Sequence, residues 1–318
     1  MRVLVLGGTG FAGRAVAEQA ARRGDEVTLF NRGRRGGASL VGDRLASDGL
    51  KALETGEWDA VVDTWSADGQ AVRRTAELLR GRAGHYTYIS SRSVYRWLTP
   101  GPLSEAAALV EETEPGYAGD KLRGERGAAA FGGPVLLARA GLILGPYEDV
   151  GRLPWWLNRI ARGGPTLAPG PRELPLQYID VRDLAAFVLD AAAARLDGPY
   201  NLVSEPGHTT MGELLETANE VTGGHAELRW TGPEVIVAKG VEPWTQLPIW
   251  FPPGPEQEFM NTAEVGPAVR AGMRCRPVRE TVVDTWSWLR SLGQPAPQRD
   301  DRPRVGLDPA VERELLGE

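Results

Sequence analysis

The chain has few of the residues that form disulfides or hold metals. Its 318 residues include one cysteine, Cys275, and three histidines, His85, His208 and His225, which lie far apart in the sequence. A single cysteine excludes an internal disulfide and a cysteine-rich metal site. The scattered histidines indicate no metal cluster either, so we expect no metal cofactor.

Long hydrophobic runs and a basic balance of charge are also absent. No stretch approaches the roughly 20 consecutive apolar residues that a membrane-spanning helix needs. The net charge of −6 argues against a nucleic-acid surface, which is usually basic. Because Met1 leads directly into an apolar run, we expect no signal peptide and a cytoplasmic location. Together these features favour an enzyme with a small-molecule substrate and neither a membrane nor a nucleic acid as partner.

The most informative motif stands at the N-terminus, where GGTGFAG occupies residues 7–13 between an apolar run and a helical pattern. Glycines at this spacing, placed between a strand and a helix, are typical of dinucleotide binding. The first permits a tight turn, the second lets backbone approach a pyrophosphate, and the third lets the helix pack against the strand. The pyrophosphate would lie on N–H groups at the start of the helix. The predicted cofactor contacts of this motif are Gly7, Gly10, Phe11, Ala12 and Gly13.

Short apolar runs alternate with helical patterns along the chain, and this order predicts an α/β fold with a Rossmann-type doubly wound parallel sheet. The predicted strands lie at 26–30, 58–63, 85–90 and 134–139, with helices at about 67–80 and 117–131. A strand-then-helix pattern returns at 174–193, followed by one more short strand, PYNLV.

The segments between these units are richer in proline and tryptophan, which predicts a second lobe built from separate pieces. We expect residues 1–146 and about 177–204 to form an NADP-binding Rossmann domain. Residues 147–176 and 205–292 would form a smaller substrate-binding lobe. The proline-rich, charged residues 293–318 would form a surface strap, with a short amphipathic stretch from Pro309 to Leu316.

Two motifs place reactive groups near the predicted cofactor. Tyr117 and Lys121 are four residues apart and therefore share one helix face. An ammonium group nearby lowers the pKa of a phenol from about 10 toward the range that suits acid–base catalysis. Ser91 ends a predicted strand and can donate to an oxygen that Tyr117 protonates. Each motif alone has an ordinary explanation, a chance pair or a helix cap, but in this order they predict a catalytic trio.

These residues resemble the extended and atypical short-chain dehydrogenases/reductases, the NAD-dependent epimerase/dehydratase family. The likeness runs from GGTGFAG through ISSRSVY, YAGDK, LILGP and QYIDVRDLA to PYNLV. It implies that Ser91, Tyr117 and Lys121 are catalytic, that Lys121 also holds the nicotinamide ribose, and that Asp43 lies near the adenine. FNRG, VGDR and GVEPWTQLPIW resemble, more narrowly, a bacterial subgroup akin to chloroplast stem-loop-binding proteins. Because members of the family often dimerise, a homodimer is a further expectation.

The residues after the second strand favour NADP(H) over NAD(H) as the cofactor. An acidic residue about 20 positions after the glycine motif would bind the ribose 2′-hydroxyl of NAD. This chain has Asn31 there instead, followed by Arg32, Arg34 and Arg35. Guanidinium groups match a 2′-phosphate well, so we assign Asn31, Arg32 and Arg35 to cofactor binding. The alternative is a solvated basic loop.

The sequence does not identify the substrate. Aromatic and polar side chains that could contact it are Tyr95, Trp97, Trp155, Trp156 and Gln177. Core packing is the alternative for the tryptophans. Three arginines of one predicted helix could bind a phosphate or carboxylate or form a solvated face, namely Arg152, Arg159 and Arg162.

Three classes of function follow. The first is an NADP(H)-dependent oxidoreductase that acts on a carbonyl or alcohol. The second is a sugar or nucleotide-sugar epimerase or dehydratase with tightly bound NAD(P), although Ser91 is followed by Arg92 and Ser93 rather than by the acidic pair usual in the dehydratases. The third is a non-catalytic cofactor-sensing or RNA-binding relative, against which the intact tyrosine and lysine and the negative net charge weigh.

Overall fold

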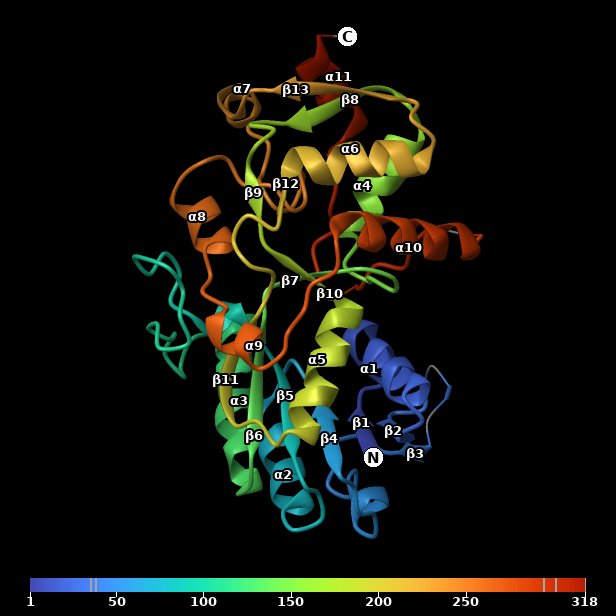
Figure 1. The fold of residues 1–318 in the computed structure, drawn as a ribbon, viewed down its shortest axis with the longest axis vertical. Coiled ribbons are helices and arrows are strands. Elements are labelled where there is room, and N and C mark those ends of the chain that lie inside the picture. The colour runs from blue at the N-terminus through green and yellow to red at the C-terminus, as the bar shows by residue number, and fades with distance from the viewer. Residues whose placement is uncertain (35, 38, 294, 301, 318) are drawn as a thin grey trace. The chain divides into compact units, whose positions relative to one another are not determined.

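A computed structural model describes every residue of the chain except 35, 38, 294, 301 and 318 (Figure 1). The chain divides into two compact units, each made of three segments. Unit 1 contains Met1–Gly141, Val181–Val203 and Glu264–Arg274. Unit 2 contains Leu142–Asp180, Ser204–Ala263 and Cys275–Glu318.

These ranges differ from the predicted domain boundaries at three places, of which the first is residues 142–146, predicted for the Rossmann domain but part of unit 2. Residues 177–180 belong to unit 2, because the strand that follows Gln177 pairs with a strand of that unit. Glu264–Arg274 belongs to unit 1, where the backbone N–H of Glu264 donates to the carbonyl of Leu103. The assignment of cofactor binding to one unit and substrate binding to the other stays a prediction.

Unit 1 is organised around a seven-stranded sheet in which every pair is parallel, in the order β11-β6-β5-β4-β1-β2-β3 (Figure 1). Its strands are β1 (Arg2–Leu6), β2 (Glu26–Asn31), β3 (Leu40–Val41), β4 (Ala60–Asp63), β5 (Tyr86–Ser91), β6 (Val135–Ala140) and β11 (Gly198–Leu202). The central strands are almost continuously apolar and buried, as strands covered on both faces must be. The predicted Rossmann-type doubly wound sheet is confirmed.

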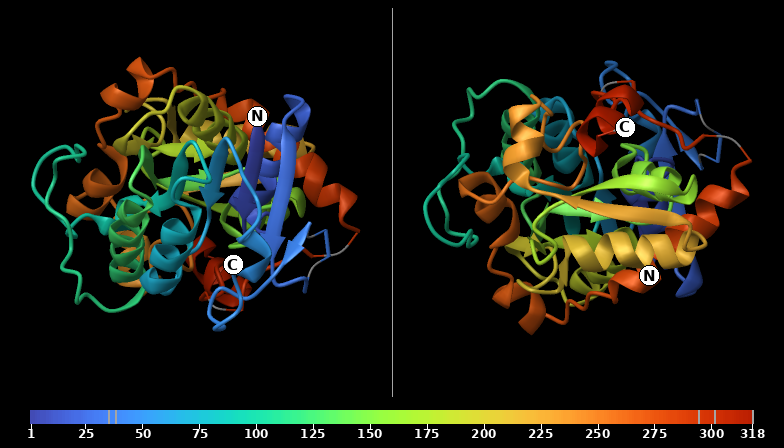
Figure 2. Two further views of the ribbon diagram at one scale, coloured as in Figure 1. Left: turned by 90° about the horizontal axis from the view of Figure 1, so that it is seen from below. Right: turned by 90° about the horizontal axis from the view of Figure 1, so that it is seen from above.

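Helices cover both faces of this sheet. They are α1 (Phe11–Arg22), α2 (Gly69–Leu79), α3 (Gly116–Ala128), α5 (Val181–Ala193) and α9 (Gly266–Arg270), with the 3₁₀ turns η1 (Lys51–Leu53), η2 (Arg92–Val94) and η3 (Ala129–Phe131). From β1 the chain crosses to β2 toward one edge of the sheet, and from β4 it crosses to β5 toward the other edge. Because both crossovers are right-handed, α1 and α2 lie on opposite faces. Accordingly, α1 packs against α5, and α2 packs beside α3 (Figure 2, left, cyan and green).

The order of strands reverses between β1 and β4, which carry the chain to opposite edges of the sheet. In sheets of this kind, ligands bind beyond the carboxyl ends of the strands at such a reversal. The residues at those ends, Leu6, Asn31, Asp63 and Ser91, therefore mark where a site should lie in unit 1.

Unit 2 combines small two-stranded sheets with helices. The strand pairs are β7 (Leu142–Leu144) with β10 (Tyr178–Asp180), β8 (Gly164–Pro169) with β13 (Ala226–Thr231), and β9 (Pro175–Leu176) with β12 (Thr209–Thr210). The pair β8 and β13 is the longest and runs parallel (Figure 2, right). The helices are α4 (Arg152–Ala161), α6 (Met211–Thr222), α7 (Pro233–Ala238), α8 (Pro255–Asn261), α10 (Val278–Ser291) and α11 (Pro309–Leu316).

The core of unit 2 forms where α6 packs against α4 and α10. Trp156 and Trp250 are fully buried there. Helix α11 covers the stretch expected to be amphipathic and packs against β8. In the described part of the chain, no helix is long and apolar enough to cross a membrane.

Candidate active site

The turn between β1 and α1 has the features that a bound pyrophosphate requires. Gly7 adopts a left-handed conformation with φ of +95°. A Cβ on Gly13 would lie 2.5 Å from the carbonyl oxygen of Gly7, so only glycine allows the helix to begin this close to the strand. Gly10 caps α1 without a side-chain hydrogen bond, and a Cβ there would meet nothing nearer than 3.8 Å. The N–H groups of Phe11 and Ala12 lie in the first turn of α1, where a helix offers them no carbonyl of its own, so they can bind an anion.

The end of β2 carries an unsatisfied donor. The side-chain Oδ1 of Asn31 accepts the backbone N–H of Gly33 at 2.8 Å, while its Nδ2 is buried with no hydrogen-bond partner among the described residues. Leaving such a group unpaired costs free energy, so an oxygen of a bound ligand would be stabilised there. Arg32 and Arg34 are exposed and form no ion pair in the described part of the chain. Arg35 lies outside the described residues.

Asp43 lies just beyond β3, beside this end of β2. Strands β2 and β3 are parallel, with Asn31 opposite Val41, so Asp43 and Asn31 share the carboxyl edge of the sheet. One carboxylate oxygen of Asp43 accepts the backbone N–H of Leu45 at 3.1 Å. The other oxygen remains available to a donor such as an adenine amino group.

The predicted catalytic residues come from α3 and the end of β5. Lys121 is only 3% exposed, and its Nζ donates to the carbonyls of Trp65 at 2.9 Å and Ile89 at 2.6 Å. The same nitrogen lies 5.9 Å from the centre of the Tyr117 ring, one turn earlier on the same helix face. Ser91 follows Ile89 by two residues, and its hydroxyl bonds to the hydroxyl and backbone N–H of Ser93, both at 3.1 Å. The structure therefore places Lys121 at the end of β5 that carries Ser91.

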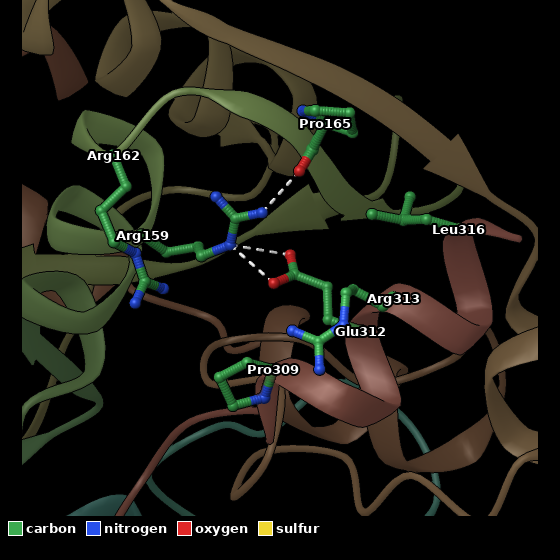
Figure 3. A pocket seen from close by; sticks show the side chains of 7 residues that line it. All are labelled: Arg159, Arg162, Pro165, Pro309, Glu312, Arg313 and Leu316. Atoms are coloured by element: carbon green, nitrogen blue, oxygen red, sulfur yellow. Dashed lines mark hydrogen bonds and ion pairs between the residues drawn. The ribbon is translucent and has the colours of Figure 1, made fainter. Parts of the chain in front are cut away.

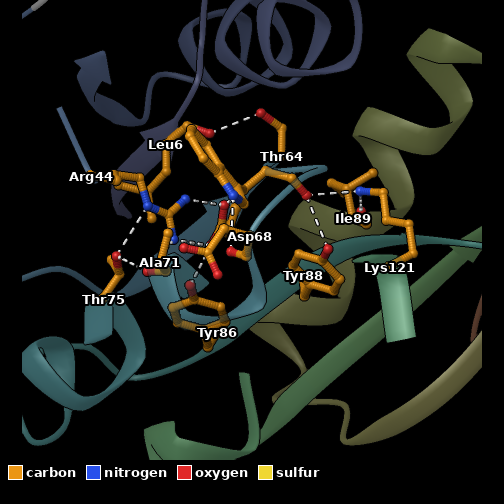
Figure 4. A network of polar contacts seen from close by, with 12 residues as sticks. Leu6, Arg44, Thr64, Asp68, Ala71, Thr75, Tyr86, Tyr88, Ile89 and Lys121 are labelled. Carbon is orange, nitrogen blue, oxygen red and sulfur yellow. Dashed lines mark hydrogen bonds and ion pairs between the residues drawn. The ribbon is translucent and has the colours of Figure 1, made fainter. Parts of the chain in front are cut away.

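A buried ion pair that the sequence analysis did not predict lies beside Lys121 (Figure 4). The guanidinium of Arg44 donates twice to the carboxylate of Asp63, at 2.6 and 2.8 Å, and both side chains are almost completely buried. Tyr86 donates its hydroxyl to Asp63 at 2.6 Å, and Tyr88 donates to the Trp65 carbonyl at 3.0 Å. We call Arg44, Asp63, Trp65, Tyr86 and Tyr88 the lysine-anchor network.

The charges of this network are set by its burial and its hydrogen bonds. Burial alone would raise the pKa of Asp63, but Arg44 and the donors from Tyr86 and Trp65 hold that pKa below its ordinary value. Burial raises the pKa of both Tyr86 and Tyr88 well above the ordinary value for a phenol. Asp63 is therefore ionised and the two tyrosines stay neutral donors at physiological pH.

A second buried network lies one turn further along the same face of α3. Glu125, one turn after Lys121, binds Arg139 through two bonds of 2.9 Å and accepts the hydroxyl of Ser90 at 2.6 Å. Arg139 also donates to the hydroxyl of Tyr95, which donates to Asn201 at 2.6 Å. Tyr95 is 2% exposed. Its contacts favour a structural role, supporting the end of β5, over the predicted contact with substrate.

Charged residues inside apolar strands were the available signal for both networks. Asp63 ends the run AVVD, and Arg139 interrupts VLLARA. A charge in such a run must be paired, since an isolated buried charge is very costly. The pattern does not identify the partner, which lies 19 residues away for Asp63 and 14 for Arg139.

The other predicted substrate contacts differ in how much of their side chain is available. Gln177 is buried, and its amide binds the carbonyls of Ser204 and Ala263 and the N–H of Ala263. This saturated amide favours a structural role. Trp155 packs edge-on against buried Trp156 with ring centres 4.6 Å apart.

Trp156 donates its indole N–H to the Pro248 carbonyl, so it is a core residue of unit 2. Trp97 lies in the loop after η2 and is 49% exposed. Of the four aromatic candidates, Trp97 is therefore the one whose ring surface is largely accessible within its own unit.

The three arginines in and directly after α4 are not equivalent, and Figure 3 shows two of them, Arg159 and Arg162. Arg159 is buried and binds the Glu312 carboxylate of α11 at 2.9 and 2.7 Å. It is therefore neither part of a solvated helix face nor available to bind a phosphate or carboxylate of a substrate. Arg152 lies over the Trp244 ring, 5.1 Å from its centre. Arg162 is exposed and, together with Arg313, borders a cavity of about 230 Å³.

Solved structures of similar fold come from several organisms. A UDP-glucuronic acid 4-epimerase from Bacillus cereus, in complex with NAD, is 15% identical with a TM-score of 0.65, covering 92% of this chain and 100% of that one. A human epimerase family protein with NADPH is 19% identical with a TM-score of 0.61 and coverage of 90% and 99%. An epimerase from Methanothermobacter thermautotrophicus is 18% identical with a TM-score of 0.67 and coverage of 91% and 92%.

At these identities the likeness shows the fold alone. No curated protein sequence matches the chain significantly. The sequence profile of one family does match, over residues 3–202, which include the glycine turn, Ser91, Tyr117, Lys121 and β11. The chain belongs to the NAD dependent epimerase/dehydratase family, whose members are NAD(P)-dependent enzymes.

Proposed function

We propose that this protein is an NADP(H)-dependent oxidoreductase that interconverts a carbonyl and an alcohol on a small molecule, with Ser91, Tyr117 and Lys121 as its catalytic residues. The observation that carries the proposal is the placement of Lys121. Its ammonium is buried and held by two carbonyls, those of Trp65 just beyond β4 and of Ile89 within β5, and Lys121 shares a helix face with Tyr117. A surface lysine four residues after a tyrosine would have no such anchorage.

The residues around the carboxyl edge of unit 1 fit a dinucleotide. The β1–α1 turn and the first N–H groups of α1 would hold the pyrophosphate. Asn31 and Arg32 would bind the adenosine ribose and its 2′-phosphate, and Asp43 the adenine. Lys121 would bind the nicotinamide ribose. The bound cofactor would supply or accept the hydride at the substrate carbon.

The roles of the trio follow from their chemistry. Tyr117 donates a proton to the substrate oxygen as the carbonyl becomes a hydroxyl, and takes it back in the reverse direction. The ammonium of Lys121 stabilises the negative charge that develops on the Tyr117 oxygen. Ser91 orients the substrate oxygen by donating its hydroxyl. Because that hydroxyl donates to Ser93 in this structure, it turns toward the substrate when substrate binds.

The unpaired Nδ2 of Asn31 and the exposed guanidiniums of Arg32 and Arg34 support NADP(H) over NAD(H). A carboxylate at the end of β2 would repel a 2′-phosphate, whereas a neutral amide and two positive charges favour it. The proposed likeness to chloroplast stem-loop-binding-protein-like bacterial reductases is consistent with this assignment but adds no residue to it.

A second candidate function, epimerisation with a permanently bound cofactor, is favoured by the match of the chain to the NAD dependent epimerase/dehydratase family. The same trio would serve it, because removal and return of hydride at one carbon need the same proton transfers. The two functions differ in what happens to the cofactor. A reductase exchanges it at each turnover, and an epimerase regenerates it in place.

The deciding experiment begins with the purified protein as isolated. Bound nucleotide is first released by denaturation and quantified. A separate sample of the native protein is then titrated with NADPH, and another with NADH. Nicotinamide fluorescence and tryptophan quenching report binding. An empty site with selective NADPH binding supports the reductase and justifies a screen of carbonyl substrates. Stoichiometric copurifying cofactor supports the epimerase. Failure to bind either nucleotide, in protein that carries none, contradicts both.

A further inference from the structure

The backbone of Trp65 connects Lys121 to the buried pair of Arg44 and Asp63 through the two peptide groups on either side of its Cα (Figure 4). On one side, its carbonyl accepts the Lys121 ammonium at 2.9 Å and the Tyr88 hydroxyl at 3.0 Å. On the other side, its backbone N–H donates to Asp63 at 3.0 Å. The residue that anchors Lys121 is therefore itself anchored by Asp63.

Asp63 and Arg44 are in turn fixed by several bonds. Besides its two bonds to Asp63, the Arg44 guanidinium donates to the Thr75 hydroxyl at 3.1 Å and to the Ala71 carbonyl at 3.0 Å, both on α2. It also lies 5.2 Å from the centre of the Trp65 ring. One almost completely buried ion pair thus contacts both the backbone and the side chain of Trp65.

The two carbonyls that hold Lys121 differ in their own support. Ile89 lies within β5, whose ladder to β4 and β6 fixes its backbone. Trp65 lies two residues beyond β4, where no ladder continues. Its position comes from the side chains of the lysine-anchor network that reach it, together with the bond from its own indole N–H to the Asp68 carbonyl at 3.0 Å.

We propose that Arg44 and Asp63 are positioning residues for Lys121 and act through the backbone of Trp65. This inference rests on the proposed function, in which the Lys121 ammonium must meet the nicotinamide ribose and Tyr117. It also links Arg44 to the other end of the proposed cofactor site. Arg44 directly follows Asp43, the proposed adenine contact, so one segment after β3 serves the adenine end of the cofactor and the lysine at its other end.

The lysine content of the chain allows a direct test. The protein has three lysines, Lys51, Lys121 and Lys239, and the first and third are exposed. In protein labelled with ¹⁵N at lysine Nζ, an ammonium that is buried and hydrogen-bonded exchanges its protons with water slowly and gives an observable signal. Lys51 and Lys239 exchange quickly and serve as internal references. The exchange rate of Lys121 then reports its anchorage without any substrate.

The informative variant is Arg44→Lys, which keeps the charge but loses the forked geometry that holds Asp63. Loss of one well-placed hydrogen bond to a charged group changes the equilibrium by about tenfold, so we expect Lys121 proton exchange to accelerate by about that factor. Arg159→Lys is the matched control. It disrupts a buried, doubly bonded pair in unit 2 that includes no residue of the lysine-anchor network. It should lower the melting temperature but leave Lys121 exchange unchanged.

An unchanged Lys121 exchange rate in folded Arg44→Lys protein overturns the inference, as does an equal acceleration in Arg159→Lys. If Arg44→Lys does not fold, Tyr86→Phe replaces it, because it removes only the hydroxyl that donates to Asp63. A smaller acceleration is then expected, and none overturns the inference. NADPH binding is measured on the same samples. Absence of binding to the wild-type protein contradicts the proposed function, while the exchange rates still decide whether Arg44 positions Lys121.

Discussion

Glu148 of unit 2 makes stability depend on pH in an unusual direction. Its side chain is completely buried, and its two oxygens accept the N–H groups of Arg152 at 2.6 Å and Leu153 at 3.1 Å, at the start of α4. Burial raises the pKa of Glu148 from 4.5 to about 7, although Arg152 and these N–H groups oppose the rise.

The sign of the effect follows from proton counts. Between pH 4.5 and 7 the carboxyl is ionised in the unfolded chain and protonated in the folded one. The folded state binds more protons in this window, so stability falls as pH rises and levels off above 7. A shift of this size corresponds to about 3 kcal/mol. Below pH 4.5 both states are protonated, and this contribution is fully present.

The perturbation that isolates this effect is Glu148→Gln, which keeps the shape and an acceptor oxygen but cannot ionise. Urea unfolding followed by tryptophan fluorescence reports mainly on unit 2, which holds seven of the ten tryptophans. All other titrating groups cancel in the difference between wild type and variant. We expect the free energy of unfolding of the wild type, relative to the variant, to fall by about 3 kcal/mol from pH 4.5 to 7.5. A difference that changes by less than about 1 kcal/mol would refute the reasoning.

Three further predictions concern named contacts. Replacing Tyr117 by Phe should lower turnover by at least about 100-fold and leave the Kd for NADPH unchanged, since only the acidic hydroxyl is lost; retained turnover would exclude Tyr117 as the proton donor. Replacing Arg32 by Ala should raise the Kd for NADPH about tenfold and leave the Kd for NADH unchanged, as measured by fluorescence titration. An equal rise in both Kd values would exclude a contact between Arg32 and the 2′-phosphate. Replacing Glu312 by Gln should lower the free energy of unfolding in urea by about 3 kcal/mol, because Arg159 loses its buried counter-charge. The control is Glu314→Gln, which removes a charge from an exposed pair with Lys239. An equally small loss of stability in both variants would contradict the prediction.

The elements that sequence reasoning predicted correctly are those with strong local patterns. The strands at 58–63, 85–90 and 134–139 correspond to β4, β5 and β6, and the two helices between them to α2 and α3. Their apolar runs and helical periodicity depend on nearest neighbours in sequence. The glycine turn was equally accessible, because the chemistry of Gly7 and Gly13 is fixed by backbone geometry.

The parts that sequence reasoning missed depend on pairing between distant residues. Strands β8 and β13 lie in different segments of unit 2, and their short runs carry no sign of a partner. The buried pair of Arg44 and Asp63 is similar: a basic residue after GD and an acid at a strand end each have ordinary solvated alternatives. Tyr95 and Gln177 were chosen as polar or aromatic groups near a site, but burial and saturated hydrogen bonds distinguish them only in three dimensions.

The last strand of the unit 1 sheet has a consequence for synthesis. Strand β11 covers β6 from Leu136 to Ala140, yet it is translated only after the whole first segment of unit 2. Until then the nascent chain presents β6 as an open edge, and unpaired strand edges recruit other chains. A fragment that stops at residue 146 would therefore expose the edge of β6, whereas one that ends at residue 203 would expose the edge of β11 and lack α9, which packs against that strand. The sheet is therefore completed on this side only when α9 (Gly266–Arg270) has been made, far beyond the last residue of β6.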